Sequence, residues 1–257
     1  MFVVNIIIKR QKMLEILQYD FIQNALIAGV LISIAAGIIG SLVVVNKITF
    51  LTGGIAHSSY GGIGLAIYMG IPVLFGATVF AVLTAILIAI ITLKNRTRID
   101  AIIGMMWASG MAIGIIFVDL TPGYNVDLMS YLFGSIIAVS REDLIYMSVL
   151  DVFIISIVVF FYKQILAVSY DSEFASLRGI NVKFFYTLIL ILAALCVVAA
   201  IKAVGLILVI ALLTIPTYLA ENFSSKLSTM MIISSILATI FTILGLIVSY
   251  SYDISSG

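Results

Sequence analysis

Long apolar runs follow one another along the chain, and short polar segments separate them. The first run, residues 21–45, is free of charged residues and lies between Asp20 and Lys47. A helix needs about 20 mostly apolar residues to cross the ~30 Å hydrocarbon core of a bilayer. This run is therefore predicted to be a helix that spans a membrane.

The next uncharged run, residues 48–93, is too long for one crossing. Gly53-Gly54 and Gly70-Ile71-Pro72 interrupt it, so it is interpreted as two spans with a helix break at the paired glycines. The eight predicted spans are residues 21–45, 55–69, 73–93, 101–118, 144–162, 184–201, 204–220 and 229–250. Residues 128–140 are apolar but supply only about two-thirds of a crossing, so a re-entrant or interfacial helix is expected there.

The positions of Lys and Arg predict the orientation, because basic residues favour the cytoplasmic side. With the N-terminus outside, the basic connections at Lys47, residues 94–98, residues 163–183 and Lys226 face the cytoplasm. The connection at residues 119–127 contains acid and no base, as an outer loop should. The basic residues at 9, 10 and 12 then lie outside, against the rule.

Composition supports the membrane assignment, since 63% of the residues are hydrophobic and 10% are charged, against about 25% charged in soluble domains. A soluble enzyme and a disordered chain are excluded. The formal charge of +1 argues against a nucleic-acid partner. One cysteine and one histidine exclude a disulfide framework and a His/Cys zinc cluster.

The expected fold is an all-α, polytopic helical bundle in the plasma (inner) membrane, with lipid around it. Residues 1–20 form a predicted tail and residues 21–257 a single transmembrane domain. The sequence contains no phosphate-binding Gly-Lys-Ser/Thr loop and no Gly-x-Ser-x-Gly nucleophile motif. The chain is therefore expected not to be an enzyme, and a transporter or channel remains.

A glycine- and hydroxyl-rich segment holds the one histidine. Gly53 and Gly54 are expected to free backbone carbonyls that line a pathway, with His57 about one turn later and Ser58 beside it. A neutral imidazole is a good ligand for divalent transition metals, and ionisable groups within membranes are usually functional. The alternative is a structural His57 at a helix end, bonded to a neighbouring carbonyl.

A short helix is predicted in the longest basic-flanked connection. Asp171 or Ser172 suits its N-cap, Glu173 its first turn, and Gly179 a left-handed C-terminal position. So short a helix is unstable alone in water, so it must dock on a partner. Phe174 and a leucine three residues later are apolar docking side chains, and a protein groove suits the acidic start better than anionic lipid.

A proline falls within the predicted span at residues 204–220. Pro216 removes one backbone donor, so a kink is expected, and Thr214 or Thr217 is placed to occupy the freed carbonyl.

Together these segments resemble the membrane permease of the metal-type ABC importers, over about residues 21–257. The resemblance rests on residues 51–57, on Asp171-Ser-Glu173-Phe174-Ala175 with Gly179-Ile-Asn following, and on residues 205–216. It implies a homodimer of permeases, two separate ATP-binding subunits, and an extracellular or periplasmic metal-binding protein. Residues 171–179 then correspond to the coupling helix that docks on the ATPase. The chain itself would hold no cofactor, and a divalent metal ion would be its cargo.

The sequence departs from the family pattern at two places. The family has an Asp four residues before the histidine, where this chain has Gly53, so only His57 carries over as a metal ligand. Asp151, inside a predicted span, is the candidate substitute, unless it is satisfied by a hydroxyl or by Lys202. The family also continues into one more span after the point where this sequence stops.

Three alternatives remain open. A permease for a metal chelate such as a siderophore or cobalamin differs in its cargo. An ion-coupled secondary transporter would use His57 and Asp151 as a relay and need no ATPase. A membrane scaffold without transport is the third.

Overall fold

The structure is a computed structural model that describes residues 19–94, 99–122 and 132–252. Its helices are α2 (Asp20–Val45), α3 (Thr49–Met69), α4 (Val73–Lys94), α5 (Ile99–Asp119), the 3₁₀ turn η2 (Ile136–Ala138), α7 (Arg141–Phe160), α8 (Tyr162–Tyr170), α9 (Ser172–Leu177), α10 (Val182–Val204), α11 (Leu206–Glu221) and α12 (Leu227–Tyr252). The described residues contain no strand, which confirms the predicted all-α class.

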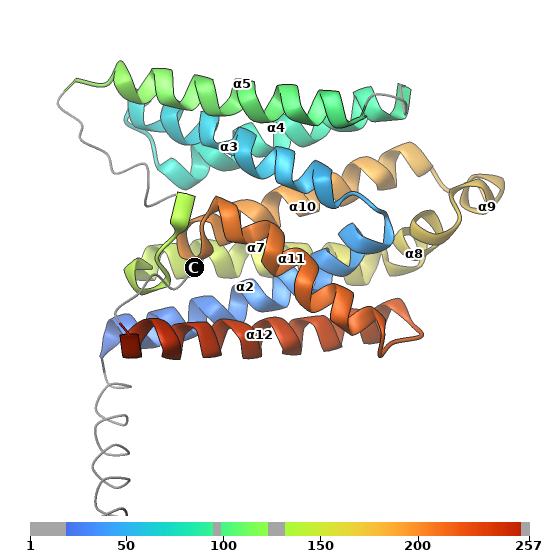
Figure 1. The fold of residues 1–257 in the computed structure, drawn as a ribbon. Helices are drawn as coiled ribbons and strands as arrows, with labels where there is room; N and C mark the ends of the chain where they lie inside the picture. Colours follow the sequence, from blue (N-terminus) through green and yellow to red (C-terminus); the bar gives the residue numbers. More distant parts are fainter. Residues whose placement is uncertain (1–18, 95–98, 123–131, 253–257) are drawn as a thin grey trace, which may run out of the picture.

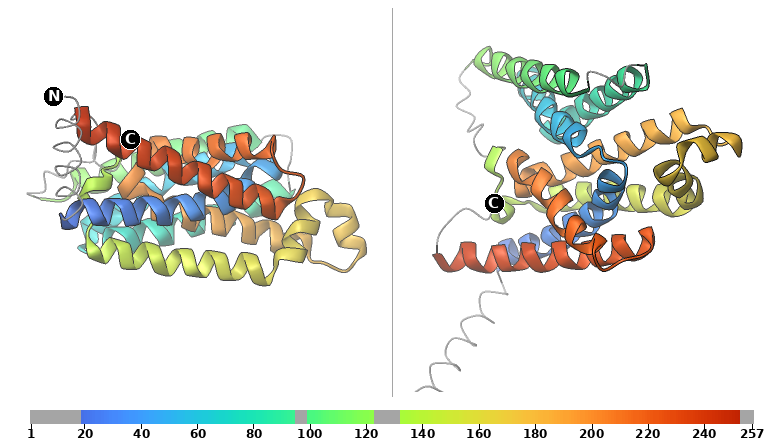
Figure 2. Two further views of the ribbon diagram at one scale, coloured as in Figure 1. Left: turned by 90° about the horizontal axis from the view of Figure 1, so that it is seen from below. Right: turned by 45° about the vertical axis from the view of Figure 1, so that its right-hand side comes forward.

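The long helices run back and forth between two ends of one bundle (Figure 1). α10 lies in its centre and packs against α2, α3, α4, α7 and α11. One group of neighbours is formed by α3, α4 and α5, and another by α2, α11 and α12 (Figure 2). The interior is built from small and branched apolar side chains, and most of α10 from residue 189 to residue 203 is buried.

Eight helices coincide with the eight predicted spans, but only six described helices are long and apolar enough to cross a membrane by themselves. The two others are α3 and α11. α3 has 21 residues but contains many glycines and several polar side chains. Sixteen of its residues are buried in the bundle. α11 has 16 residues, which is about 24 Å of helix.

The helix break predicted at Gly53-Gly54 is wrong. Both glycines lie inside the continuous helix α3, which begins at Thr49 rather than Ile55. Their lack of a side chain serves packing instead: a Cβ on Gly53 would lie 2.9 Å from Ile210 Cδ1, and one on Gly54 would lie 2.7 Å from Ile103 Cγ2. The two glycines would allow the helix to break, but their packing against other helices keeps this segment helical.

The helix predicted at residues 128–140 lies partly outside the described residues; residues 132–133 are helical, but the predicted helix does not continue from residue 134. Residues 134–140 form one 3₁₀ turn between extended residues. This segment packs on the junction of α10 and α11, where the Ser135 N–H donates to the Lys202 carbonyl at 3.1 Å. Gly134 and Gly205 both have positive φ, and their backbones meet so closely that neither position has room for a Cβ.

Charge divides the two ends of the bundle. The end that carries α8 and α9 holds most of the described basic residues: Lys47, Lys94, Lys163, Arg178, Lys183 and Lys226. The opposite end holds the start of α2, the end of α5 and the start of α7, with several carboxylates. The basic residues predicted to face the cytoplasm thus share one end, apart from those at 96 and 98. These two, like the basic residues of the tail, lie outside the described residues.

Candidate functional site

His57 lies within α3, buried, with 7% of its surface exposed. Its ring stacks on Trp107 of α5, with centroids 3.7 Å apart and planes 9° apart. Its Nδ1 atom is buried without a hydrogen-bond partner. His57 is thus not at a helix end, and its Nδ1 atom is not bonded to a carbonyl, as the structural alternative had assumed.

Small residues bring α5 close enough to α3 for this stacking. A Cβ on Gly110 would lie 2.6 Å from Ser58 Cβ, and Gly114 approaches the backbone of Tyr60 just as closely. Trp107 lies three residues before Gly110 and seven before Gly114, hence on the same face of α5. The close contact of the two helices therefore places the indole within stacking distance of the imidazole.

The predicted neighbours of His57 have modest roles. The Ser58 hydroxyl donates to the Gly54 carbonyl at 2.7 Å. Ser58 also lines a cavity of about 230 Å³ between α3, α4 and α5, where Thr84 and Ser109 supply two further hydroxyls. Because α3 is unbroken at Gly53 and Gly54, their carbonyls are not freed in the way the sequence predicted.

Asp151 does not join His57 in the way the sequence suggested. It lies on α7, which packs against α2 and α10, whereas α3 packs mainly on α4 and α5. Asp151 is 3% exposed, and neither carboxylate oxygen has a hydrogen-bond partner. The described residues contain no cluster of three or more His, Cys, Asp or Glu side chains that would hold a metal ion.

The expected pairing of Lys202 with Asp151 is also wrong. Lys202 Nζ instead donates to Asp143 Oδ2 at 2.5 Å, at the opposite end of the bundle from α9. The same oxygen accepts from the Ser140 backbone N–H at 2.8 Å and from the Ser140 hydroxyl at 2.6 Å. This capping box fixes the start of α7 and ties it to α10.

The short helix predicted at residues 171–179 is observed as α9. Asp171 caps it by accepting from the Phe174 N–H at 2.8 Å, and Gly179 ends it with φ +77°. Ala175 is fully buried against the bundle. The Arg178 guanidinium lies 5.0 Å from the centre of the Phe174 ring.

The outer side of α9 is unusually exposed for apolar residues. Leu177 is 88% exposed and Phe174 is 48% exposed, and Glu173 is exposed as well. α8 and α9 extend past the ends of the neighbouring long helices (Figure 1). An apolar surface on a projecting helix of six residues fits the expectation that it docks on a partner.

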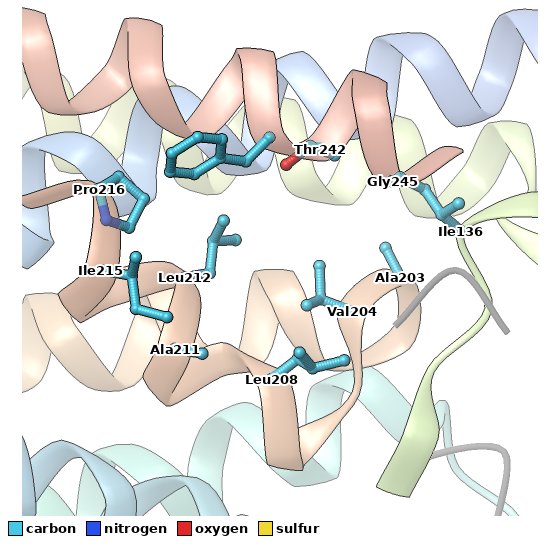
Figure 3. Close-up of a pocket in the computed structure, with 11 residues that line it drawn as sticks. Ile136, Ala203, Val204, Leu208, Ala211, Leu212, Ile215, Pro216, Thr242 and Gly245 are labelled. Carbon is cyan, nitrogen blue, oxygen red and sulfur yellow. The ribbon is translucent and has the colours of Figure 1, made fainter. Parts of the chain in front are cut away.

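Pro216 lies inside α11, as predicted, but the threonines do not take the expected role. The Thr214 hydroxyl donates to the Ile210 carbonyl at 2.7 Å, and Thr217 Oγ1 lies 2.7 Å from Ser234 Oγ of α12. The carbonyl that Pro216 frees belongs to Leu212, four residues earlier. Pro216 and Leu212 line an apolar pocket of about 260 Å³ between the end of α10, α11 and α12 (Figure 3).

The sequence profile of the ABC 3 transport family matches residues 18–257. The chain belongs to the ABC 3 transport family. An uncharacterised membrane protein of Synechocystis is 44% identical over 96% of this chain and 88% of its own length. The manganese transport system membrane protein MntC of Listeria monocytogenes is 33% identical over 94% of this chain and 86% of its own length.

A solved structure, PsaBC from Streptococcus pneumoniae in complex with Fab, has the same fold. It superposes with a TM-score of 0.87 at 31% identity, over 96% of this chain and 89% of the other. Family membership confirms the resemblance seen in the sequence. Together with the six membrane-crossing helices, it makes the chain a multi-pass transport protein of the plasma membrane.

Sequence reasoning missed one residue of this ABC 3 site. Trp107 is the one tryptophan of the chain, and nothing near it in sequence links it to His57. The usable signal was the spacing of Gly110 and Gly114 on the same face of the predicted span, because small residues at such spacing mark a close helix contact in membranes.

Proposed function

We propose that this ABC 3 protein is the permease subunit of an ATP-binding cassette importer for a divalent transition metal ion. Two copies would form the pathway, and a separate ATP-hydrolysing subunit would drive alternating access through α9. A binding protein would deliver the ion to the outer face. The basic end that carries α9 would lie in the cytoplasm, as the positive-inside rule favours.

The exposed apolar side of α9 carries this proposal. Ala175 anchors the helix to the bundle, whereas Leu177 is almost fully exposed and Phe174 about half exposed. The chain has no phosphate-binding loop of its own. A separate ATP-hydrolysing subunit that binds α9 would bury these side chains and would also supply the energy for transport.

His57 supports a metal ion as cargo. Its buried Nδ1 atom has no partner, and a neutral imidazole nitrogen binds manganese, iron and zinc. The named functions of similar proteins, such as the manganese transport system protein of Listeria, agree with this class. With Gly53 in place of the family's Asp, each copy offers one imidazole, so the ion would meet His57 from both copies on its way through the dimer.

The α9 contact is tested by copurification with an ATP-binding subunit of a metal importer from the same organism. Leu177→Asp is expected to abolish copurification, because it places a carboxylate in the apolar contact. Lys163→Gln is a matched control on the neighbouring helix α8 and should copurify normally. Full copurification of Leu177→Asp would contradict the role of α9. Competition of uptake by free and by chelated metal separates an ion from a chelate as cargo.

A further inference from the structure

A polar pocket lies at the same end of the bundle as α9 and is separate from the His57 site. It has a volume of about 320 Å³ and lies between the end of α2, the end of α8 and the connection from α11 to α12. Its polar lining includes Lys47, Lys226, Ser224, Tyr170 and Glu221. Two cationic side chains, hydroxyl groups and one carboxylate thus surround a space large enough for a small anionic group.

The two lysines are free to bind a ligand. The ion pairs of the described residues join Arg141 with Asp20 and Lys202 with Asp143, so neither Lys47 nor Lys226 is neutralised by Glu221 or by another carboxylate. The three charges of the pocket sum to +1. Its electrostatic preference is therefore for an anion, and Glu221 weakens that preference.

Lys47 stands where a glycine is the usual residue. It has φ +56° and is the one described non-glycine residue with positive φ. The Lys47 N–H donates to the Val44 carbonyl and the Ile48 N–H to the Val43 carbonyl, each at 3.0 Å, which is the pattern that ends a helix with a left-handed residue. A lysine in this conformation is less stable than a glycine, so the turn alone gives no reason for a long cationic side chain.

The depth of the pocket identifies the source of the anion. α2 has 26 residues, which is about 39 Å of helix against a hydrocarbon core of ~30 Å. The end of α2 at Val45 therefore reaches the level of the lipid headgroups. The pocket opens there among the basic residues of this end, where anionic lipids of the cytoplasmic leaflet accumulate.

We propose that this pocket binds the phosphate group of an anionic phospholipid. Lys47 and Lys226 pair with the phosphate, and the Ser224 hydroxyl donates to it. The first backbone N–H groups of α12, which begins at Leu227, face the same connection and add favourable dipoles. The acyl chains of the lipid then lie along the apolar flank of the bundle.

The bound lipid also supports α9. Ser169 and Tyr170 line the pocket and end α8, and the next residue, Asp171, caps α9. A headgroup in the pocket would thus stabilise the N-terminal end of α9, the helix that we propose contacts the ATPase. This consequence rests on the proposed function, whereas lipid binding itself rests only on the cytoplasmic orientation proposed there and not on the ATPase.

Lipid binding is tested by native mass spectrometry of the purified full chain with added phosphatidylglycerol. The double variant Lys47→Gln/Lys226→Gln should bind this lipid more weakly by about five-fold for each lysine. Glu221→Gln should bind it more tightly, and Lys163→Gln, an exposed lysine of the same end outside the pocket, should bind as the original chain does. Equal binding by the double variant, or an equal loss in Lys163→Gln, would overturn the proposal.

Two further measurements separate the remaining interpretations. Lys47→Gly should raise the thermal stability while it weakens lipid binding, so a loss of binding cannot be attributed to misfolding. Inorganic phosphate added to the chain in zwitterionic lipid should not compete for the pocket at concentrations where phosphatidylglycerol does. Competition by phosphate with no effect of phosphatidylglycerol would overturn the lipid as the source. None of these results depends on an ATPase.

Discussion

His57 and Trp107 lie face to face at 3.7 Å between ring centroids, although they come from different helices. The indole covers one face of the imidazole and so restricts the directions from which a ligand reaches it. Nδ1 remains without a partner. The stack therefore holds the imidazole in one orientation while Nδ1 stays available as a ligand.

The first prediction concerns this pair. His57→Ala should abolish metal uptake while the protein still reaches the membrane and assembles. Trp107→Ala should lower uptake by about ten-fold or more, because an imidazole freed from its orientation loses the benefit of a fixed geometry. Trp107→Phe, which keeps a stacking ring, should retain most of the activity. Uptake of labelled manganese, zinc and iron by cells is the measurement, and normal uptake by His57→Ala would remove this residue from the pathway.

A second prediction concerns the missing carboxylate at Gly53. Asp at this position would restore a hard oxygen ligand four residues before His57, one helical turn away. Because a Cβ there would lie 2.9 Å from Ile210 Cδ1, Gly53→Asp alone should fold poorly. Gly53→Asp with Ile210→Val should fold and should shift uptake toward manganese relative to zinc. An unchanged ratio of the two metals in the double variant would contradict a ligand position at residue 53.

The third prediction concerns Lys202 and Asp143. Lys202→Met leaves the Asp143 carboxylate, whose side chain is 9% exposed, without its cation. The bonds from Ser140 remain, so the expected loss of stability is about 1–2 kcal/mol. Lys202→Met with Asp143→Asn should recover most of it, because no unpaired charge is left. Thermal unfolding in detergent measures both, and equal losses in the single and double variants would show that the pair is not coupled.

The fourth prediction concerns Asp151. An unpaired carboxylate in a membrane interior is costly, and Asp151 has no partner for either oxygen. Asp151→Asn should therefore leave the thermal stability equal or higher. It should also leave metal uptake unchanged, since the residue is not placed beside His57. Loss of uptake with normal folding would instead return Asp151 to the pathway and favour the ion-coupled alternative.

The sequence predicted features that depend on local chemistry. The charged residues that bound the apolar runs located the long helices, because a charge rarely enters a membrane span. α9 was predicted with its cap at Asp171 or Ser172 and its left-handed end at Gly179, since capping depends on a few neighbouring residues; the structure has Asp171 as the cap. Pro216 was likewise found within its helix, as predicted.

Features that depend on contacts between helices were not predicted. Gly53 and Gly54 permit a helix break, but packing against Ile210 and Ile103 keeps them helical. The partner of Lys202 depends on which helices are neighbours at that end of the bundle. The predicted ends of the spans do not show which helices are neighbours. The contact of Trp107 with His57 was missed for the same reason.

The central claim is that a separate ATP-hydrolysing subunit moves the ion through this permease. The most direct measurement is metal accumulation by vesicles that contain the purified chain, with and without its ATP-binding subunit, read by a metal-sensitive dye inside. Uphill accumulation is predicted only when the subunit and ATP are both present, and its loss is predicted with Leu177→Asp. Uphill accumulation by the chain alone would contradict the claim.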